Sequence, residues 1–485
     1  MSEGPSIAVV GGGFGGVGAA VMLKREGYED VTVFEKSDRI GGVWRANTYP
    51  GAACDIPSHL YEFSFAPNSW SRRFSPGPEI RAYIEGVARH FGVLERIRTG
   101  IEVKGASWDE QCRKWRLETS AGPHEADVLV TACGQLSAPK VPPLAGLEAF
   151  EGPAFHTAEW RHDVDLAGKR VALIGTGCSA IQVGPAIQPE VAQLDVYQRS
   201  PGWTLAKGDF AYTRSLRAAF RRLPMLHRLD RASVYAFQDL AAAAFTRYRW
   251  LLPLFRMLGM RQINAAISDS ELRRKVTPSH EFGCKRVMLT DDWYPTLTRD
   301  NVELVAEGVD GVTPSGIRDS TGVERPADAI VFATGFASHD FVAPMAITGS
   351  DGLALESAWA EVARAYLGLS VPGFPNMFLL YGPNTNGGSG SVVNTIECGV
   401  GHLLAALREM ERVGASRIEV SRAAAEDFDR ELRAALAGTV WQSGCHNWYV
   451  DENGNDPNNW PWTWTAFRRR TRELAPGAYE LARAP

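Results

Sequence analysis

Two glycine-rich turns, each set between a short apolar run and a helical stretch, constrain the fold of this 485-residue chain most strongly. The first turn follows the apolar residues 7–10 and carries Gly11, Gly13 and Gly16. A helical stretch comes next, and a second apolar run then ends at Glu35. In a strand–turn–helix–strand unit of this kind, glycines allow close backbone approach, and the helix N-terminus faces a pyrophosphate. The pattern predicts a dinucleotide-binding unit at the start of the chain.

The same unit recurs further along the chain. Residues 170–174 form another apolar run, and Gly175, Gly177 and Ala180 occupy the positions of a G-x-G-x-x-A turn. Ser179 lies in the same turn and is expected, like its neighbours, to contact the second nucleotide. The sequence therefore predicts two separate dinucleotide sites.

The residue that ends the second strand of each unit distinguishes the two sites. Glu35 lies 24 positions after Gly11, and Arg199 lies 24 positions after Gly175. A carboxylate accepts hydrogen bonds from ribose hydroxyls and repels a 2′-phosphate, so the first site suits FAD or NAD and not NADP. A guanidinium holds a 2′-phosphate through paired charge-assisted bonds, so the second site, with Ser200 beside Arg199, is predicted to bind NADPH. The two nucleotides together imply hydride transfer from NADPH to a flavin.

We therefore expect an α/β protein with two Rossmann-like domains, one for FAD and one for NADP. The FAD domain is predicted in two parts, residues 1–152 and 326–485, with the NADP domain inserted between them at 165–325. Residues 203–281 lack strand alternation and are expected to form a helical insertion in the NADP domain. The link at 152–163 is expected to act as a hinge, with the substrate bound in the cleft between the domains.

Charge and cysteine content argue against several classes of protein. A net charge of −5 gives no reason to expect a nucleic-acid or anionic-membrane partner. Seven scattered cysteines form no C-x-x-C pair, which argues against a disulfide framework, a metal site or a thioredoxin-type redox pair. The same pattern favours a cytoplasmic protein. The N-terminus runs directly into a predicted strand and leaves no room for a signal peptide. Nothing in the sequence indicates an oligomeric state.

No stretch approaches the roughly 18 uninterrupted apolar residues that would cross a bilayer. The nearest candidate, residues 236–260, is interrupted by Asp239 and by three arginines. We expect amphipathic helices packed within a domain here, with a hydrophobic lid or substrate funnel as the less favoured alternative.

Two further segments carry longer patterns. Residues 42–55, GVWRANTYPGAACD, match G-x-W-x-x-x-x-[F/Y]-P-G-x-x-x-D, and residues 150–160, FEGPAFHTAEW, match F-x-G-x-x-x-H-x-x-x-W. Both patterns resemble fingerprints of the type I Baeyer–Villiger monooxygenases. Trp160 favours this family over the nitrogen- and sulfur-oxidising flavin-containing monooxygenases, which usually have Tyr there. Arg161 departs from the Pro or Asp that usually follows. The resemblance extends over residues 7–449.

The resemblance implies FAD and NADPH as cofactors, and a small ketone and O2 as substrates. One oxygen atom would be inserted next to the carbonyl through a C4a-peroxyflavin, giving an ester or lactone. Arg286, in a segment similar to the family's Lys-Arg segment, is expected to lower the pKa of the hydroperoxide and to stabilise the oxyanion. Asp55 is expected to orient Arg286 and to balance its charge. Lys285 is expected near the 2′-phosphate, and Trp448 near the nicotinamide ribose.

Other residues are assigned through the same resemblance. Residues 328–335 are similar to the D-x-x-x-x-A-T-G motif that returns the chain to the flavin. The expected FAD contacts outside the first fingerprint are Trp44, Asp55, Gln135, Thr334 and Gly335. His156 is expected to be structural and to tie down the linker between the nucleotide domains. Residues 381–386 resemble the family branch that includes 4-hydroxyacetophenone-type monooxygenases. A similar segment also occurs in N-hydroxylating relatives, which leaves the preferred substrate open.

Three alternatives remain. A nitrogen- or sulfur-oxidising flavin monooxygenase would bind the same two nucleotides but would need no cation at Arg286. An NADPH-dependent flavoprotein disulfide reductase would need a cysteine pair beside the flavin, and no closely spaced pair is present. A non-catalytic flavoprotein would bind a partner, and NADPH would fail to bleach its flavin.

Overall fold

The first of two parallel sheets consists of β19 (Met377–Leu379), β7 (Val128–Thr131), β1 (Ile7–Val10), β2 (Val31–Glu35) and β3 (Ile97–Thr99), in that spatial order. The central strands β1 and β7 are buried along their whole length, as expected for apolar runs in a parallel sheet covered on both faces. Helix α1 (Phe14–Arg25) packs on β1 and β2, and α3 (Gly77–His90) and α11 (Val392–Val413) pack against α1. The structure, a computed structural model, describes residues 4–483.

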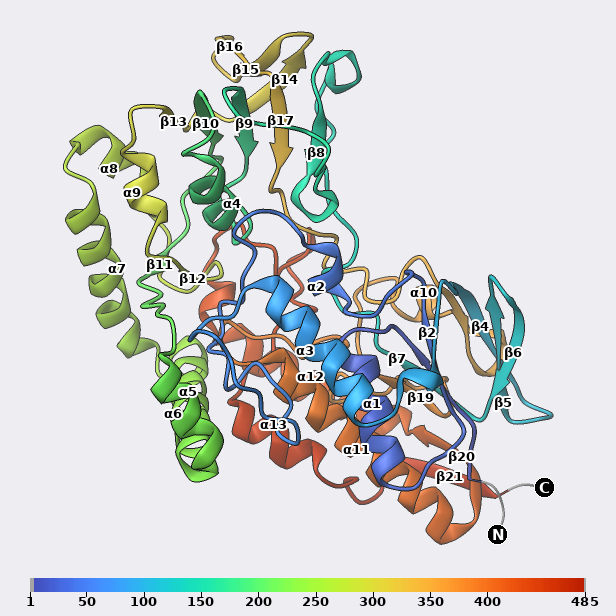
Figure 1. Cartoon of the computed structure of the whole chain (residues 1–485). Helices are drawn as coiled ribbons and strands as arrows, with labels where there is room; N and C mark the ends of the chain where they lie inside the picture. The colour runs from blue at the N-terminus through green and yellow to red at the C-terminus, as the bar shows by residue number, and fades with distance from the viewer. Residues whose placement is uncertain (1–3, 484–485) are drawn as a thin grey trace.

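The second sheet repeats this arrangement with β13 (Val302–Val305), β10 (Gln193–Tyr197), β9 (Arg170–Ile174), β17 (Ala329–Phe332) and β8 (Ala154–His156), again all parallel. Helix α4 (Ala180–Ile187) follows β9, and α9 (Trp293–Leu297) packs on α4 and β13. In Figure 1 this sheet forms the upper lobe and the first sheet lies in the lower lobe. The predicted α/β fold with two Rossmann-like units is confirmed.

The strand order moves two of the expected boundaries. Strands β8 and β17 both belong to the second sheet, although residues 152–163 were expected to be a hinge and residue 326 to begin the return to the flavin domain. The chain rejoins the first sheet only after Phe332, at β19. Isolated three- or four-residue strands carry too little periodicity to be assigned to one sheet or the other from the sequence.

The expected helical insertion is present within residues 203–281. It contains α5 (Arg214–Arg222), α6 (Pro224–Thr246), the short η4 (Arg249–Leu251), α7 (Leu252–Ala266) and α8 (Ser270–Val276). Two short parallel strands, β11 (Thr204–Leu205) and β12 (Met288–Leu289), close its base. These helices run down the left side of the molecule in Figure 1. None of the helices between residues 4 and 483 is long and apolar enough to cross a membrane.

One continuous apolar core joins the second sheet, the insertion and the C-terminal segment. Its buried members include Leu173 of β9, Trp203, Phe245 of α6, Tyr449 and Trp460. The C-terminal residues thus pack against the upper lobe and reach the junction between the lobes. The remaining elements are α2 (Val43–Ala46), α10 (Leu355–Ala358), α12 (Arg422–Ala437), α13 (Trp464–Thr471), η1 (Leu94–Arg96), η2 (Leu147–Ala149), η3 (Thr157–Glu159), η5 (Ser350–Gly352), η6 (Val440–Gln442), β4 (Val103–Asp109), β5 (Lys114–Thr119), β6 (Gly122–Ala126), β14 (Val309–Thr313), β15 (Gly316–Asp319), β16 (Glu324–Pro326), β18 (Ala346–Thr348), β20 (Ala415–Val420) and β21 (Tyr479–Arg483).

Candidate active site

The two glycine turns have the same local geometry. Gly11 has φ +115°, and a Cβ on it would lie 2.5 Å from the carbonyl oxygen of Ala132. Gly175 has φ +111°, and a Cβ there would lie 2.5 Å from the carbonyl oxygen of Ala333. A Cβ on Gly16 would come within 1.8 Å of the Gly11 carbonyl oxygen. Each turn therefore requires glycine for the chain to pass close to the next strand, as a dinucleotide fingerprint demands.

The acid at the end of β2 is fixed by the first turn. The backbone N–H of Gly12 donates to Glu35 Oε2 at 2.7 Å, and that of Ser37 donates to Oε1 at 2.9 Å. Gly13 precedes the first residue of α1, so the N-terminus of that helix opens beside this carboxylate. A buried carboxylate held in this way keeps lone pairs free for ribose hydroxyls, and these residues fit the adenosine half of FAD.

The equivalent position after β10 is basic. Lys285 Nζ donates to Ser200 Oγ at 2.5 Å, and burial together with the charge of Arg199 lowers the pKa of Lys285. Neither Arg199 nor Lys285 forms an ion pair with any residue in the range 4–483. Two neighbouring cations without a carboxylate leave their charge available to an anion. Gly177, Ser179 and Ala180 form the turn into α4 next to them.

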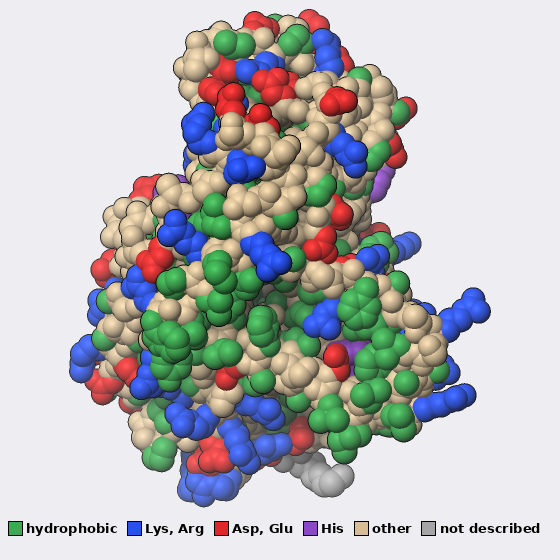
Figure 2. Space-filling view, turned by 90° about the vertical axis from the view of Figure 1, so that its left-hand side faces the viewer, with side chains coloured by type: hydrophobic (Ala, Val, Ile, Leu, Met, Phe, Trp, Pro, Cys, Tyr) green, Lys and Arg blue, Asp and Glu red, His purple; other side chains and the backbone are tan. Residues whose placement is uncertain are grey.

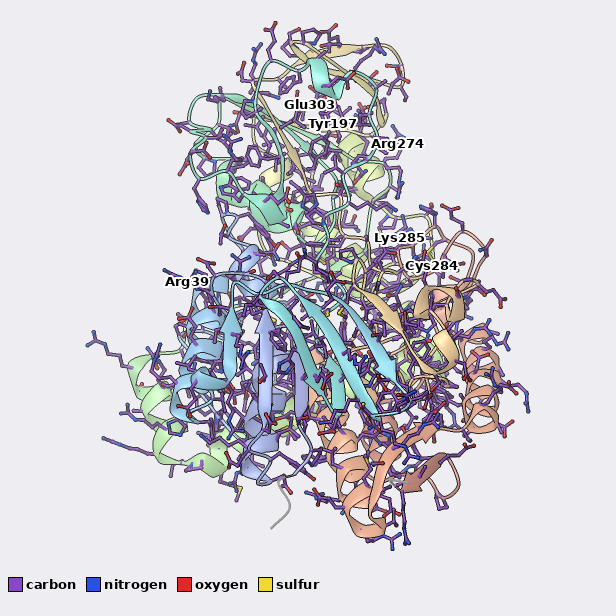
Figure 3. The ribbon with its side chains drawn as sticks, turned by 90° about the vertical axis from the view of Figure 1, so that its right-hand side faces the viewer. Arg39, Tyr197, Arg274, Cys284, Lys285 and Glu303 are labelled. Carbon is purple, nitrogen blue, oxygen red and sulfur yellow. A yellow bond between two sulfur atoms is a disulfide. The ribbon has the colours of Figure 1, made fainter. Side chains whose placement is uncertain are left out.

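Two further basic residues, which were not identified as candidates from the sequence, lie at the same site. A cavity of about 380 Å³ is lined by Arg199 together with Arg274 and Lys275, both from α8. Figure 3 shows Arg274 in the upper lobe, above Lys285 and Cys284, which lie near the junction of the two lobes. The run Arg273-Arg274-Lys275 was a visible signal, but only the fold brings it to Arg199. Glu307 lines the same cavity and Lys275 pairs with Glu271 at 3.5 Å. Arg199 and Arg274, which form no ion pair within residues 4–483, are therefore the cations of this cavity that fit the 2′-phosphate of NADP.

Asp55 and Arg286, predicted from motifs 231 positions apart, form one ion pair. Arg286 Nη2 donates to Asp55 Oδ2 at 2.6 Å, and each side chain is 26% exposed. Partial burial opposes ionisation of Asp55, but the charge and hydrogen bond of Arg286 prevail and lower its pKa. The charge of Asp55 raises the pKa of Arg286 well above its usual value. Both groups are therefore held in their charged forms.

Three side chains around Arg286 were not identified as candidates from the sequence. They are Cys178 of the second glycine turn, Tyr381 and Tyr449. Burial raises the pKa of all three, and the charge of Arg286 acts on each in the opposite direction. The Tyr449 hydroxyl is buried and has no hydrogen-bond partner among residues 4–483. The cluster thus joins both fingerprint regions to the C-terminal segment around one fixed cation.

The segment 42–55 is docked on the start of α4. Gln182 Oε1 accepts from Tyr49 Oη at 2.9 Å, and Gln182 Nε2 donates to the Ala53 carbonyl at 2.9 Å. These contacts carry Asp55 to the second nucleotide unit. Trp44 instead stays with the first unit, where its Nε1 donates to Tyr61 Oη at 3.1 Å.

The other residues expected at FAD lie in two places. Gln135 follows β7; its Nε2 donates to Asn458 Oδ1 at 2.5 Å, and its buried Oε1 has no partner within residues 4–483. Such a buried acceptor fits a polar edge of the flavin. Thr334 and Gly335 follow β17, directly after the Ala333 carbonyl that meets Gly175. They therefore adjoin the second turn, and their assignment to FAD stays a prediction.

The expectation of no disulfide was wrong. Cys284 and Cys445, 161 positions apart, are bonded to each other. Cys284 immediately precedes Lys285, and Cys445 lies three positions before Trp448. The Trp448 carbonyl accepts from His339 Nε2 at 3.0 Å, so this loop is fastened on a second side. Long-range cysteine pairs leave no spacing signal, and the pairing also removes the ground for a reducing cytoplasm.

The segment 150–160, which carries the second of the two longer sequence patterns, helps to determine how the chain passes between the two lobes. His156 is buried, its Nδ1 accepts from the backbone N–H of Ala158 at 3.1 Å, and burial lowers its pKa. The departing residue Arg161 forms an exposed pair with Asp163, away from this core. His162 Nε2 lies 2.8 Å from Thr48 Oγ1, which ties the linker to the 42–55 segment.

Comparison with known proteins shows which family this chain belongs to. The sequence profile of the flavin-binding monooxygenase-like family matches residues 4–346. Proteins named Baeyer–Villiger monooxygenase are similar over nearly the whole chain, at 43% identity in Streptomyces coelicolor and 42% in Pseudomonas aeruginosa, covering 98% and 99% of this chain and 92% of each relative.

Solved structures agree with these relatives. An oxidised steroid monooxygenase bound to NADP superposes with a TM-score of 0.88 at 31% identity, over 99% of this chain and all of the other. Cyclohexanone monooxygenase in a closed crystal structure gives a TM-score of 0.88 at 28% identity, over the full length of both chains. The chain therefore belongs to the flavin-binding monooxygenase-like family and is a Baeyer–Villiger monooxygenase.

Proposed function

We propose that this enzyme converts a ketone to an ester or lactone at the cluster formed by Asp55 and Arg286, with FAD and NADPH as its cofactors. The ion pair between these two side chains is the observation that carries the proposal. When bound, FAD reduced by NADPH supplies the activated oxygen of O2. The chain's own residues bind and orient the reactants and stabilise the charge that develops in the reaction.

Binding of NADPH is assigned to the cationic site after β10. Arg199 and Lys285 would hold the 2′-phosphate, with Ser200 positioning Lys285 through its hydroxyl. Because the glycine turn at Gly175 leads directly into α4, the pyrophosphate would meet the backbone N–H groups of Gly177, Ser179 and Ala180. FAD would be held by Glu35 and the Gly11–Gly16 turn, with Trp44 and Gln135 nearer its reactive end.

Arg286 is proposed to stabilise the negative charge that develops on the ketone oxygen when the carbonyl carbon is attacked. A guanidinium suits this role because it stays protonated at any working pH, and Asp55 raises its pKa further. A fixed donor that meets developing charge contributes about 3 to 4 kcal/mol to catalysis of related acyl chemistry. Asp55 keeps the guanidinium in one orientation, so little reorganisation is needed during the reaction.

Buried aromatic side chains adjoin this cation on one side. The charge of Arg286 acts on Tyr449, whose ring lies 6.1 Å from that of Trp441 and 4.5 Å from that of Trp448. The structural relatives are named steroid monooxygenase and cyclohexanone monooxygenase, and an apolar ketone is the substrate class that these aromatic side chains would favour.

The test is product analysis with linear, cyclic and aryl ketones, using NADPH and isotopically labelled O2. The proposal predicts an ester or lactone carrying one labelled oxygen atom per NADPH consumed productively. Sulfoxides or N-oxides alone, with no ester from any ketone, would instead favour the nitrogen- or sulfur-oxidising alternative. The pair observed between Asp55 and Arg286 would then need another role.

A further inference from the structure

The outer surface of the helical insertion is apolar. Among residues 4–483, 16 large apolar side chains are exposed, and 11 of them lie between Leu223 and Leu258. Trp250 is the most exposed of all, at 74%. Isolated exposed apolar residues are common on monomeric proteins, but a contiguous set on one element marks an interaction surface.

These side chains follow the helical period on α6. Leu226, Leu229, Phe237 and Leu240 are exposed and fall on one stripe of the helix. The larger buried residues of the same helix, His227, Val234, Gln238 and Phe245, fall on a different side. The helix therefore has two apolar faces, of which only one is used in the core.

Helix α7 continues the pattern. Leu254, Met257 and Leu258 are exposed on one side, while Leu252 and Ile263 are buried on the other. The short turn η4 joins α6 to α7 and presents Trp250 between them. Residues 236–260 were expected to be packed inside a domain, but their large apolar side chains from Phe237 to Leu258 include seven that are exposed.

The charge of this region is opposite to that of the whole chain. Residues 214–261 contain ten arginines, two aspartates and no lysine or glutamate, whereas the net charge of the full chain is −5. Seven of the arginines, from Arg214 on α5 to Arg261 on α7, are exposed and form no ion pair within residues 4–483. Figure 2 shows this side of the molecule, with basic side chains interspersed among the apolar ones.

We propose that this surface, the exposed faces of α5, α6, η4 and α7, docks onto an anionic lipid bilayer. An amphipathic face with aromatic and aliphatic side chains surrounded by arginines matches the interfacial region, where acyl chains meet phosphate groups. Trp250 and Tyr248 provide the aromatic side chains that favour this depth. Arg261 lies on the same stripe as Leu254 and Met257, where it would meet a lipid phosphate.

A second copy of the chain fits the surface less well. A two-fold contact brings the same patch of both copies together, and it would set the unpaired arginines against one another. An anionic bilayer satisfies both the charge and the apolar area at once. The net charge of −5 gave no reason to expect an anionic membrane partner, because it is summed over the whole chain and does not show that this region is basic.

The inner face of α6 adjoins the candidate active site. Ser389 Oγ donates to the Gln238 carbonyl at 2.9 Å, and the Phe245 ring fills the space beside Gly283, two positions before Lys285. The same helix would thus touch lipid on one side and the wall of the site on the other. The docking itself does not depend on the proposed reaction.

The test is co-sedimentation of the full-length holoenzyme with vesicles of phosphatidylcholine alone or mixed with phosphatidylserine. We expect binding to the mixed vesicles at low salt, weaker binding at high salt, and little binding to phosphatidylcholine alone. The double variants Trp250→Ser with Met257→Ser, and Arg256→Glu with Arg261→Glu, should each lower the partition coefficient at least about tenfold.

Matched controls lie on other surfaces. Leu94→Ser with Val323→Ser removes exposed apolar side chains elsewhere, and Arg89→Glu changes an exposed, unpaired arginine on α3. These controls should bind as the wild type does, and all variants should keep its thermal midpoint. Absence of binding to mixed vesicles, or equal binding by face and control variants, would overturn the proposal. So would a dimer that the Trp250 and Met257 changes dissolve, without any vesicle binding.

Discussion

Replacing Arg199 with alanine should separate NADPH from NADH as a hydride donor. Arg199 and Lys285 are neighbouring cations with no carboxylate paired to them, so the 2′-phosphate is their expected partner. A hydrogen bond to a charged group contributes about 1.5 to 3 kcal/mol. At about 1.4 kcal/mol per tenfold change, Arg199→Ala should weaken NADPH binding roughly 10- to 100-fold. NADH lacks this phosphate, so its binding should change less than about threefold.

The assay is anaerobic flavin reduction, followed by the loss of flavin absorbance, at graded NADPH and NADH concentrations. Arg89→Ala, an exposed and unpaired position on α3, serves as the matched control and should change neither value. The reasoning would be refuted if Arg199→Ala weakened both nucleotides equally, or if it weakened neither.

The same variant has a pH signature. Burial and the charge of Arg199 lower the pKa of Lys285, so its ammonium loses its proton at lower pH than an ordinary lysine. A phosphate binds the charged form, so NADPH affinity should be full below the Lys285 pKa and fall as the pH rises through it. Arg199→Ala removes one cause of the lowering, and the fall should move to higher pH.

Three further changes test other parts of the structure. Cys284→Ser removes the bond to Cys445 and should lower the free energy of unfolding by about 2 to 5 kcal/mol. A dithiol reductant should lower the thermal midpoint of the wild type but not that of the variant. An equal response of both proteins would contradict the pairing. Gly16→Ala, whose Cβ would meet a backbone oxygen at 1.8 Å, should yield protein without bound flavin, whereas Gly86→Ala, with open space around it, should purify with flavin as usual. Asp55→Asn keeps an acceptor for Arg286 but removes the negative charge, so the hydrogen bond is no longer between two charged groups; ester formation should fall about tenfold with flavin reduction retained. Retention of full ester formation would show that the charge of Asp55 has no such role.

The nucleotide units could be predicted because their signal is local. Gly11 and Gly175 each require a left-handed backbone next to a neighbouring carbonyl, and that requirement appears in the sequence as a glycine at a fixed spacing. The change from Glu35 to Arg199 was equally local. The fold class and the location of the helical insertion followed from the same patterns.

The long-range contacts could not be predicted in this way. Arg274 meets Arg199 only because α8 returns to the end of β10, and Tyr449 meets Arg286 only because the C-terminal segment reaches the upper lobe. The pairing of Cys284 with Cys445 has the same origin. Strand β17 was placed with the wrong sheet because its four buried residues fit either one.

The exposed side of α6 shows a different limit. The sequence showed an amphipathic helix with an interrupted apolar stretch, and burial of that stretch was the favoured interpretation. Whether an apolar stripe faces a core or solvent depends on its neighbours, which a single sequence does not define.

Arg286→Ala tests the central claim most directly, by comparing ester formation with flavin reduction in one preparation. If Arg286 stabilises developing charge at the ketone, its loss should lower ester or lactone formation roughly 10²- to 10³-fold. Flavin reduction by NADPH and sulfoxidation of a thioether should remain near their wild-type rates. Ester formation that stays near the wild-type rate, or that falls only in step with flavin reduction, would contradict the proposed role of this cation.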